Sequence, residues 1–388
     1  MMELKKYKLG DCLELQRGYD LTSSQMQRGC VAVAGSNGII GYHDTERGNR
    51  PCITVGRSGS VGKVHYYEQP TWVHNTALYV KDFKGNNPKY LYYFLMNLHL
   101  DKVFALGSSV VPSLDRKNVH ALVVPFHKDR HEQEQIANIL SLIDEKIVLN
   151  RALNQNLEAL AKQLYDYWFV QFDFPNEEGK PYKSSGGKMV WNEKLKREIP
   201  EEWEVLPLFD AVSVQYGFPF ATDHFTEEET NIPVVRIRDI LEGTTSAFSL
   251  ENVDKKYHLN KGDVLVGMDG NFHMNFWHDN IAYLNQRCVR LRAYSDSTIS
   301  PIQILHSIKP YIKAKEQSSK GSTVGHLSDK DLKGLYLVKP LNSGTFNPRK
   351  ILDELLKLVI EKKRQILSLT KQRDYLLPLL MNGQITIE

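Results

Sequence analysis

The segment VGRSGSVG at residues 55–62 has a counterpart, VGMDGNFH, at residues 266–273. Both follow a short apolar run, and both carry two glycines three residues apart, Gly56 and Gly59 in the first and Gly267 and Gly270 in the second. A match between distant parts of one chain indicates an internal repeat. A repeat determines the type of fold, so it is identified before single helices and strands. The two segments therefore anchor an alignment of the two halves of the chain.

Further matched segments follow in the same order in both halves. They pair Leu9-Gly10-Asp11 with Leu208-Phe209-Asp210, Gly18 with Gly217, Asn75 of WVHNTALYV with Asn285 of YLNQRCVRL, Pro88 with Pro301, and Gly107 of GSSVVPSLDRKNVHALVV with Gly321 of GSTVGHLSDKDLKGLYLV. The spacing between partners increases once and then holds, as one loop insertion in the second copy would produce. One large domain without a repeat is the alternative, and so many matches in register disfavour it.

Each half alternates short apolar runs with glycine turns, a pattern typical of strands. The predicted strands are residues 30–34, 52–55, 78–80 and 121–124 in the first half and 234–237, 264–266 and 289–291 in the second. A helix with proline near its first turn is predicted in each half, over residues 88–100 and 301–315. Each half is therefore expected to be a small mixed α/β module.

A different pattern begins at His131. The stretch EQEQIANILSLIDEKIVLNRALNQNLEALAKQLYDYWF, residues 132–169, contains neither glycine nor proline, and Pro175 is expected to end the helix near Phe172. Residues four and three apart form a coiled-coil seam. The seam consists of Ile136, Leu140, Ile143, Ile147, Asn150, Asn154, Leu157, Ala161, Leu164 and Trp168.

A second long helix is predicted from near Pro348 to residues 377–381, with Gly383 as its stop signal. Its seam consists of Leu352, Leu355, Val359, Lys362, Ile366, Leu369, Arg373 and Leu376. Each helix is about 50 to 60 Å long at a rise of 1.5 Å per residue, which is more than one small module can cover. We therefore expect the two helices to pack on each other; the alternative is that each lies along its own module.

The predicted fold class is α+β, with two similar α/β modules separated by a pair of long antiparallel coiled-coil helices and related by an internal pseudo-two-fold axis. The expected domains are a first module at 1–130, a long helix at 131–172, a linker at 173–200, a second module at 201–346 and a second long helix at 347–383. The linker contains NEEGKPYKSSGGK, which is rich in turn and charged residues.

Composition excludes several classes of protein. With 41% hydrophobic and 24% charged residues, the chain is typical of a globular protein, and its formal net charge of +3 neither requires nor excludes nucleic acid. The four cysteines, Cys12, Cys30, Cys52 and Cys288, show no CxxC spacing, so a zinc site or a disulfide framework is not expected. The N-terminal sequence has no apolar signal core, and no run approaches the ~20 residues that cross a bilayer.

The sequence resembles the specificity subunits of type I restriction-modification systems. The resemblance lies in GSSVVPSLDRKNVHALVVPFH with EQEQIANILSLIDEKI, in the connector segments DYWFVQFDFP, GKPYKSSGGKMVW and EIPEEWEV, and in the terminal QRDYLLPLLMNGQI, and it covers nearly the whole chain. It implies a cytoplasmic prokaryotic protein in which each module recognises one half of a split DNA site. The paired helices would then separate the modules and dock two methyltransferase subunits.

The same resemblance implies that this chain is a non-catalytic subunit without cofactors. S-adenosylmethionine, ATP and Mg would serve the methyltransferase and motor-nuclease subunits of the complex. Motifs of an independent enzyme are missing: there is no PP dipeptide followed by an aromatic residue, and GRSGSVGK lacks the P-loop spacing. The spacing of Asp166 with Glu178 and Lys180 is taken as chance, and His273 and His278 are a weak metal pair. An autonomous nuclease or methyltransferase, or a scaffold that binds only protein, remains the alternative.

Polar residues in the glycine turns and basic residues beside them are the candidates for DNA contact, because bases and phosphates are bound by such side chains. Arg236 and Arg238 are the strongest pair, since alternation would place both on one strand face. The candidates are Asn37, His43, Arg57, Ser58, Lys63, Ser108 and Ser109 in the first module and Arg236, Arg238, Asp239, Asp269, Asn271, Lys320, Ser322 and Thr323 in the second.

Overall fold

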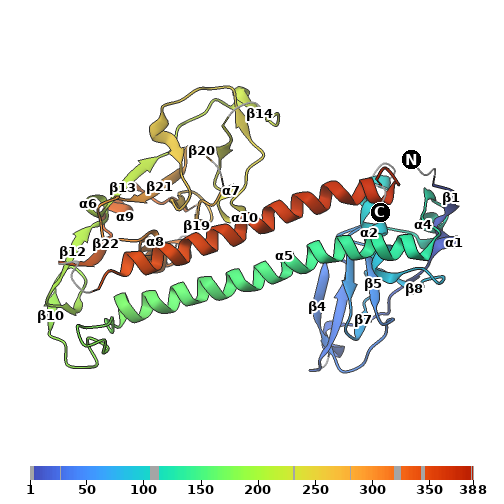
Figure 1. The fold of residues 1–388 in the computed structure, drawn as a ribbon, viewed down its shortest axis with the longest axis horizontal. Helices are drawn as coiled ribbons and strands as arrows, with labels where there is room; N and C mark the ends of the chain where they lie inside the picture. Colours follow the sequence, from blue (N-terminus) through green and yellow to red (C-terminus); the bar gives the residue numbers. More distant parts are fainter. Residues whose placement is uncertain are drawn as a thin grey trace. The chain divides into compact units, whose positions relative to one another are not determined.

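The chain divides into two compact units in a computed structural model that describes residues 4–26, 28–104, 113–229, 232–279, 281–318, 325–341, 346–385 and 387. Unit 1 comprises Met1–Val148 and Ser368–Glu388, and unit 2 comprises Leu149–Leu367 (Figure 1). Each unit contains one α/β module and a part of each long helix.

Unit 1 is built on a four-stranded antiparallel sheet in the order β2-β8-β5-β6. Its apolar core joins this sheet to α2 and to the start of the first long helix. The strands of unit 1 are β1 (Lys6–Lys8), β2 (Glu14–Arg17), β3 (Val31–Gly35), β4 (Gly38–His43), β5 (Cys52–Gly56), β6 (Val64–Tyr67), β7 (Thr71–Val73), β8 (Ala77–Asp82) and β9 (Val123–Pro125). Its short helices are α1 (Leu9–Cys12), α2 (Pro88–Asn97), α3 (Leu100–Phe104) and α4 (Arg116–His120).

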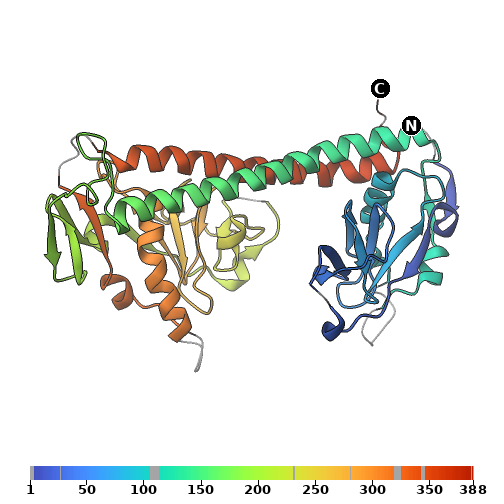
Figure 2. The same cartoon turned by 90° about the horizontal axis from the view of Figure 1, so that it is seen from below.

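Unit 2 has a four-stranded antiparallel sheet in the order β13-β21-β18-β19. Helix α8, the orange helix in Figure 2, packs on this sheet, and its isoleucines are buried in the same core. Its strands are β10 (Met189–Asn192), β11 (Arg197–Pro200), β12 (Trp203–Pro207), β13 (Val212–Tyr216), β14 (Phe225–Thr226), β15 (Val234–Val235), β16 (Phe248–Ser249), β17 (His258–Leu259), β18 (Val264–Gly267), β19 (Met274–Phe276), β20 (Ala282–Leu284), β21 (Cys288–Ala293) and β22 (Tyr336–Pro340). Its short helices are α6 (Leu208–Ala211), α7 (Asp239–Glu242), α8 (Pro301–Ser318) and α9 (Asp329–Lys333).

The two sheets have the same connectivity, as the internal repeat predicts. Strands β2, β8, β5 and β6 correspond in order to β13, β21, β18 and β19. The parallel pair β3 and β7 corresponds to β15 and β20, and the antiparallel pair β1 and β9 corresponds to β12 and β22. Each unit is thus one copy of the same mixed α/β module.

One of the sequence matches is shifted by one residue. Tyr19 bridges His74, whereas the equivalent Phe218 bridges Asn285, so Asn285 corresponds to His74 and not to Asn75. The neighbouring glycines explain the register. A Cβ on Gly18 would lie 2.3 Å from the carbonyl oxygen of His74, and one on Gly217 would lie 1.9 Å from that of Asn285. The match between residues 107 and 321 lies outside the described residues.

The predicted strand 234–237 is wrong in its second half. Strand β15 ends at Val235, because the backbone N–H of Arg236 donates to Asp239 (2.9 Å) and the chain turns into α7. Arg236 and Arg238 therefore do not share a strand face. The helix predicted over residues 88–100 is also divided, into α2 and α3, with His99 at a φ of 45° between them.

The two long helices have nearly the predicted extents. Helix α5 (Arg130–Tyr165) continues into a π-helical turn and ends before Phe172, which has a φ of 61°. Helix α10 (Pro348–Met381) ends ahead of Gly383. The residues of both predicted seams are buried or half-buried. Because these residues recur every three or four positions, they form one buried stripe along each helix.

Each unit contains a contact between α5 and α10. In unit 1 the Arg373 guanidinium lies 2.9 Å from the Asp144 carboxylate, and the end of α10 adds Leu377 and Leu380 to the core. In unit 2 the Lys363 ammonium lies 3.0 Å from Glu158. The start of each helix therefore meets the end of the other within one unit.

The connector at 173–200 is more ordered than the linker that its composition indicates. Strands β10 and β11 form an antiparallel hairpin, and Phe174 and Ile199 are buried in the core of unit 2. The turn residues account only for its bends, since Gly179 and Gly186 have φ values of 74° and 88°. The aromatic and aliphatic residues between them fix the connector on the module.

Cys12, Cys30, Cys52 and Cys288 are free thiols in the structure. Cys12, Cys52 and Cys288 are buried, and burial raises the pKa of Cys52 to about 12. Across the described ranges, no helix is both long and apolar enough to span a membrane.

Candidate DNA interface and partner surface

Three loops of unit 1 bring together four of the predicted residues. Lys63, at the end of the β5–β6 loop, donates to the amide oxygen of Asn37 in the β3–β4 turn (2.6 Å). In the same β5–β6 loop, the backbone N–H of Arg57 donates to the carbonyl oxygen of Thr76 ahead of β8 (2.8 Å), and Ser58 follows it. Asn37, Arg57, Ser58 and Lys63 therefore lie in one loop cluster with amide, hydroxyl and cationic groups.

The β5–β6 loop and its counterpart in unit 2 need glycine at the same place. Gly59 and Gly270 have φ values of 80° and 68°, in the left-handed region that side chains disfavour. A Cβ on Gly56 would lie 1.9 Å from the carbonyl oxygen of Ser60. The glycines therefore hold the backbone of this loop in a tight turn.

Sequence reasoning missed several polar residues of the unit 1 cluster. Arg17 donates to Asp20 (2.9 Å), and the side-chain amide of Asn75 donates to the same carboxylate. His65 lies beside the turn at Gly38, and its pKa is lowered by burial and by Lys63. For Arg17 and Asp20, the only indication in the sequence was that they flank Gly18. Nothing in the sequence indicated His65.

In unit 2 the equivalent loop carries a cluster of three polar side chains. Asp269, in the β18–β19 loop, accepts from a ring nitrogen of His326 (2.6 Å) and pairs with Arg287 (3.3 Å), which precedes β21. Arg287 has a φ of 66° and an exposed side chain. Asp269 was predicted from its place in the repeat, whereas Arg287 and His326 were missed because each stands far from it in sequence.

The β15–α7 loop lies against the same glycine turn. A Cβ on Gly267 would lie 2.9 Å from Ile237, which places residues 236–238 beside the β18–β19 loop and the exposed Asn271. Arg236 donates to the nearly buried Asp239 (2.9 Å), so these two residues hold the loop together. Arg238 has 73% of its side chain exposed and is the residue of this loop available for a ligand.

His43 does not belong to the candidate interface. It is buried against Trp72, with the two rings 4.7 Å apart, and its Nδ1 accepts from the backbone N–H of Thr45 (2.9 Å). Strand β4 directs the His43 side chain inward, so it packs in the module instead of facing DNA.

Five of the predicted residues lie outside the described residues: Ser108, Ser109, Lys320, Ser322 and Thr323.

Helix α5 presents a second apolar stripe besides its buried seam. Leu149, Leu153 and Leu160 recur at spacings of four and seven, and their exposed fractions are 59%, 40% and 42%. Residues at these spacings share one face of a helix. Three exposed leucines on one face are an unusual feature of a free surface and typical of a protein interface.

No group of three or more histidine, cysteine or acidic side chains that would hold a metal occurs in the part of the chain that the structure describes. Of the weak pair His273 and His278, the latter is buried with its ring packed on Gly243, where a Cβ would lie 1.6 Å from the imidazole. His278 is therefore a packing residue.

A family model described as type I restriction modification DNA specificity domain matches residues 1–159 and 200–367. The specificity subunit of the type I restriction enzyme MjaIX from Methanocaldococcus jannaschii is 27% identical over 312 residues, which is 77% of this chain and 69% of that protein. The EcoBI specificity subunit of Escherichia coli is 29% identical over 195 residues, 49% of this chain and 41% of its own length.

A crystal structure of the type I restriction-modification S subunit from M. genitalium has a similar fold. The TM-score is 0.63 at 16% sequence identity, and the match covers 99% of this chain and 96% of that one. The duplicated module and the long helices thus occur together in a solved structure.

Proposed function

Because this chain belongs to the family of type I restriction-modification DNA specificity domains, we propose that it recognises a bipartite DNA site, one half through each unit, and carries out no catalysis itself. The observation that carries the proposal is the repeated loop cluster. Both units present the loop after β3 or β15, the loop after β5 or β18 and the segment before β8 or β21 next to one another. Two copies of one recognition module are suited to two separate stretches of duplex.

The chemistry of the two clusters supports DNA as the ligand. Arginine, lysine and asparagine are among the side chains that bind phosphates and base edges. Unit 1 offers Asn37, Arg57 and Lys63, and unit 2 offers Arg238 and Arg287. The clusters differ in their side chains on the same backbone frame, so the two halves of the site are expected to differ in sequence.

The long helices are proposed to form an antiparallel coiled-coil pair that sets the distance between the modules. The ion pairs Asp144–Arg373 and Glu158–Lys363 support this, because residue numbers increase along α5 where they decrease along α10. A helix of 36 residues is about 54 Å long at 1.5 Å per residue. Modules held one or two helical turns of B-DNA apart, about 34 Å per turn, face the same side of the duplex.

The two long helices are proposed to dock methyltransferase subunits, two per chain, with the exposed leucine face of α5 as part of the docking surface. In this arrangement S-adenosylmethionine belongs to the methyltransferase subunits, and ATP and Mg belong to motor-nuclease subunits that join the full complex. The family and the apolar stripe at Leu149, Leu153 and Leu160 support this division. The whole complex would act on DNA in the cytoplasm of a prokaryote.

The decisive experiment is to map methylated bases in a genome after expressing this chain with its methyltransferase subunit. We expect a split motif with a spacer of constant length. A continuous motif would contradict the bipartite proposal. Methylation or cleavage by the purified chain alone would instead favour an autonomous enzyme, and failure of the assembled complex to bind duplex DNA would favour a protein scaffold.

Arg238→Ala is expected to weaken binding of the mapped site by about 5- to 150-fold, or ~1 to 3 kcal/mol, if Arg238 pairs with a guanine edge. The loss should be confined to one base position of the half-site recognised by unit 2. Fluorescence anisotropy with duplexes substituted at each position measures it. Lys188→Ala, an exposed lysine on the connector, is the control for loss of one charge. Unchanged discrimination at every position would remove Arg238 from base recognition, and a uniform loss would make it a phosphate contact.

A further inference from the structure

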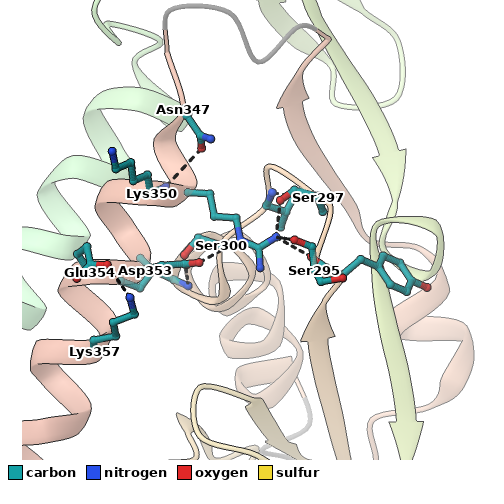
Figure 3. Close-up of polar contacts among 12 residues, drawn as sticks. Ser295, Ser297, Ser300, Asn347, Lys350, Asp353, Glu354 and Lys357 are labelled. Atoms are coloured by element: carbon teal, nitrogen blue, oxygen red, sulfur yellow. Dashed lines mark hydrogen bonds and ion pairs between the residues drawn. The ribbon is translucent and has the colours of Figure 1, made fainter.

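Arg349, in the first turn of α10, bonds the helix to its module beside the buried Leu352. Nη1 of Arg349 donates to the carbonyl oxygens of Tyr294 (2.6 Å), Ser295 (3.3 Å) and Ser297, and Nε donates to Asp353 one turn further along the helix (3.0 Å). Figure 3 shows three of these acceptor residues, Ser295, Ser297 and Asp353. The carbonyl groups belong to the loop between β21 and α8. The guanidinium thus adds directed hydrogen bonds, at the end of the four-stranded sheet, to the apolar packing of α10 on the module.

The first turn of α5 repeats this arrangement in unit 1. Nη1 of Arg130 donates to the carbonyl oxygen of Gly85 (2.6 Å), in the loop between β8 and α2, and Nε donates to Glu134 four residues on (3.1 Å). Strand β8 corresponds to β21 and α2 to α8. The two arginines therefore occupy equivalent places in the two copies of the fold.

We propose that Arg130 and Arg349 are positioning residues that fix the orientation of each recognition module on its own long helix, and thereby the spacer length that the protein accepts. A guanidinium is planar and presents its N–H groups in fixed directions, so bonds to a carboxylate and to backbone carbonyls constrain rotation as well as distance. The carboxylate at i+4 holds the side chain along the helix, and the carbonyls hold the module.

This inference rests on the proposed function, because a spacer exists only for a bipartite site. Base recognition tolerates errors of only about 0.5 Å or 10–20° in the groups that make it. A rotation at the joint between helix and module is transmitted to every loop of that module. Loosening one joint should therefore leave the half-site contacts intact but relax the requirement for one spacer length.

The experiment uses the full chain assembled with its methyltransferase subunits and duplexes with the native spacer or with one base pair added or removed. Arg349→Ala is expected to reduce the preference for the native spacer by about tenfold. Binding to a duplex in which the half-site of unit 1 is scrambled should change less than about threefold, because the contacts of unit 2 with its own half-site remain. Arg130→Ala should give the same result with the half-sites exchanged.

Two further variants make the result specific. Arg349→Lys keeps the charge but cannot donate to Asp353 and to the carbonyls in the same geometry, so an intermediate loss of spacer preference is expected. If Arg349→Ala does not fold, Arg349→Lys tests the same loss of spacer preference. Lys357→Ala removes an exposed lysine on the same helix that pairs only with Glu354 among the described contacts, and it should behave as wild type.

Folded Arg349→Ala and Arg130→Ala proteins that keep the wild-type spacer preference would overturn the inference and leave the arginines a purely stabilising role. Loss of half-site binding equal to the loss of full-site binding would overturn it as well, because the defect would then lie within the module. A wild-type complex without any bipartite site would instead contradict the proposed function, so the two failures are distinguishable.

Discussion

Leu149→Asp combined with Leu160→Asp is expected to abolish assembly with the methyltransferase subunits, raising the dissociation constant by at least about 100-fold. Both side chains are exposed in this chain, at 59% and 42%, and lie on one face of α5. Burial of a leucine in an interface contributes about 1.5 to 3 kcal/mol, and two aspartates would add the cost of burying carboxylates. The fold should be retained, because neither leucine belongs to an apolar core.

Sedimentation or mass photometry of the purified subunits mixed at defined concentrations measures this assembly. Gln155→Asp with Ala159→Asp is the matched control, since it adds two carboxylates to exposed positions of the same helix away from the leucine face. Equal assembly of the leucine variant and the control would show that the docking surface lies elsewhere. Circular dichroism of both variants checks that α5 is intact.

The sequence was most informative where a pattern was long. The seams of α5 and α10 recur over many turns, so their extents and buried faces followed from spacing alone. The repeat was similarly strong, because glycines such as Gly18 and Gly217 are required by close backbone contacts and keep their places in both copies. Shared topology of the two sheets follows from that match.

The candidate site was less predictable because contacts between loops are not local in sequence. Arg287 and His326 meet Asp269 from two other segments, and neither has a signal of its own. Alternation placed Arg236 on a strand, but the bond from its own backbone N–H to Asp239 ends the strand first. The residues around His43 in the sequence are typical of a surface turn, but in the structure Trp72 packs against its ring.

The connector shows the same limitation on a larger scale. Its glycines and charged residues predicted a linker, whereas its aromatic residues determine where it lies. Phe172 and Phe174 pack on Trp203 with ring centroids 5.5 and 5.0 Å away, and Arg197 donates to the carbonyl oxygen of Phe169 (3.2 Å). The end of α5, the hairpin and β12 are therefore held by one aromatic cluster around Trp203.

Trp203→Ala is accordingly expected to lower the free energy of unfolding of unit 2 by about 3 to 5 kcal/mol, the usual cost of removing a large buried aromatic side chain. Trp203 is 5% exposed and contacts three phenylalanines, whereas Trp191 on β10 is 58% exposed and its side chain bonds only Glu193 among the described contacts. Trp191→Ala should therefore cost less than about 1 kcal/mol. Urea unfolding, with hydrogen exchange of β13 and β21 to isolate unit 2, compares the two variants. Equal costs would mean that the aromatic cluster around Trp203 does not hold the connector on the module. A large cost for Trp203 alone supports the role of this aromatic cluster in holding the end of α5 and the connector on the module of unit 2.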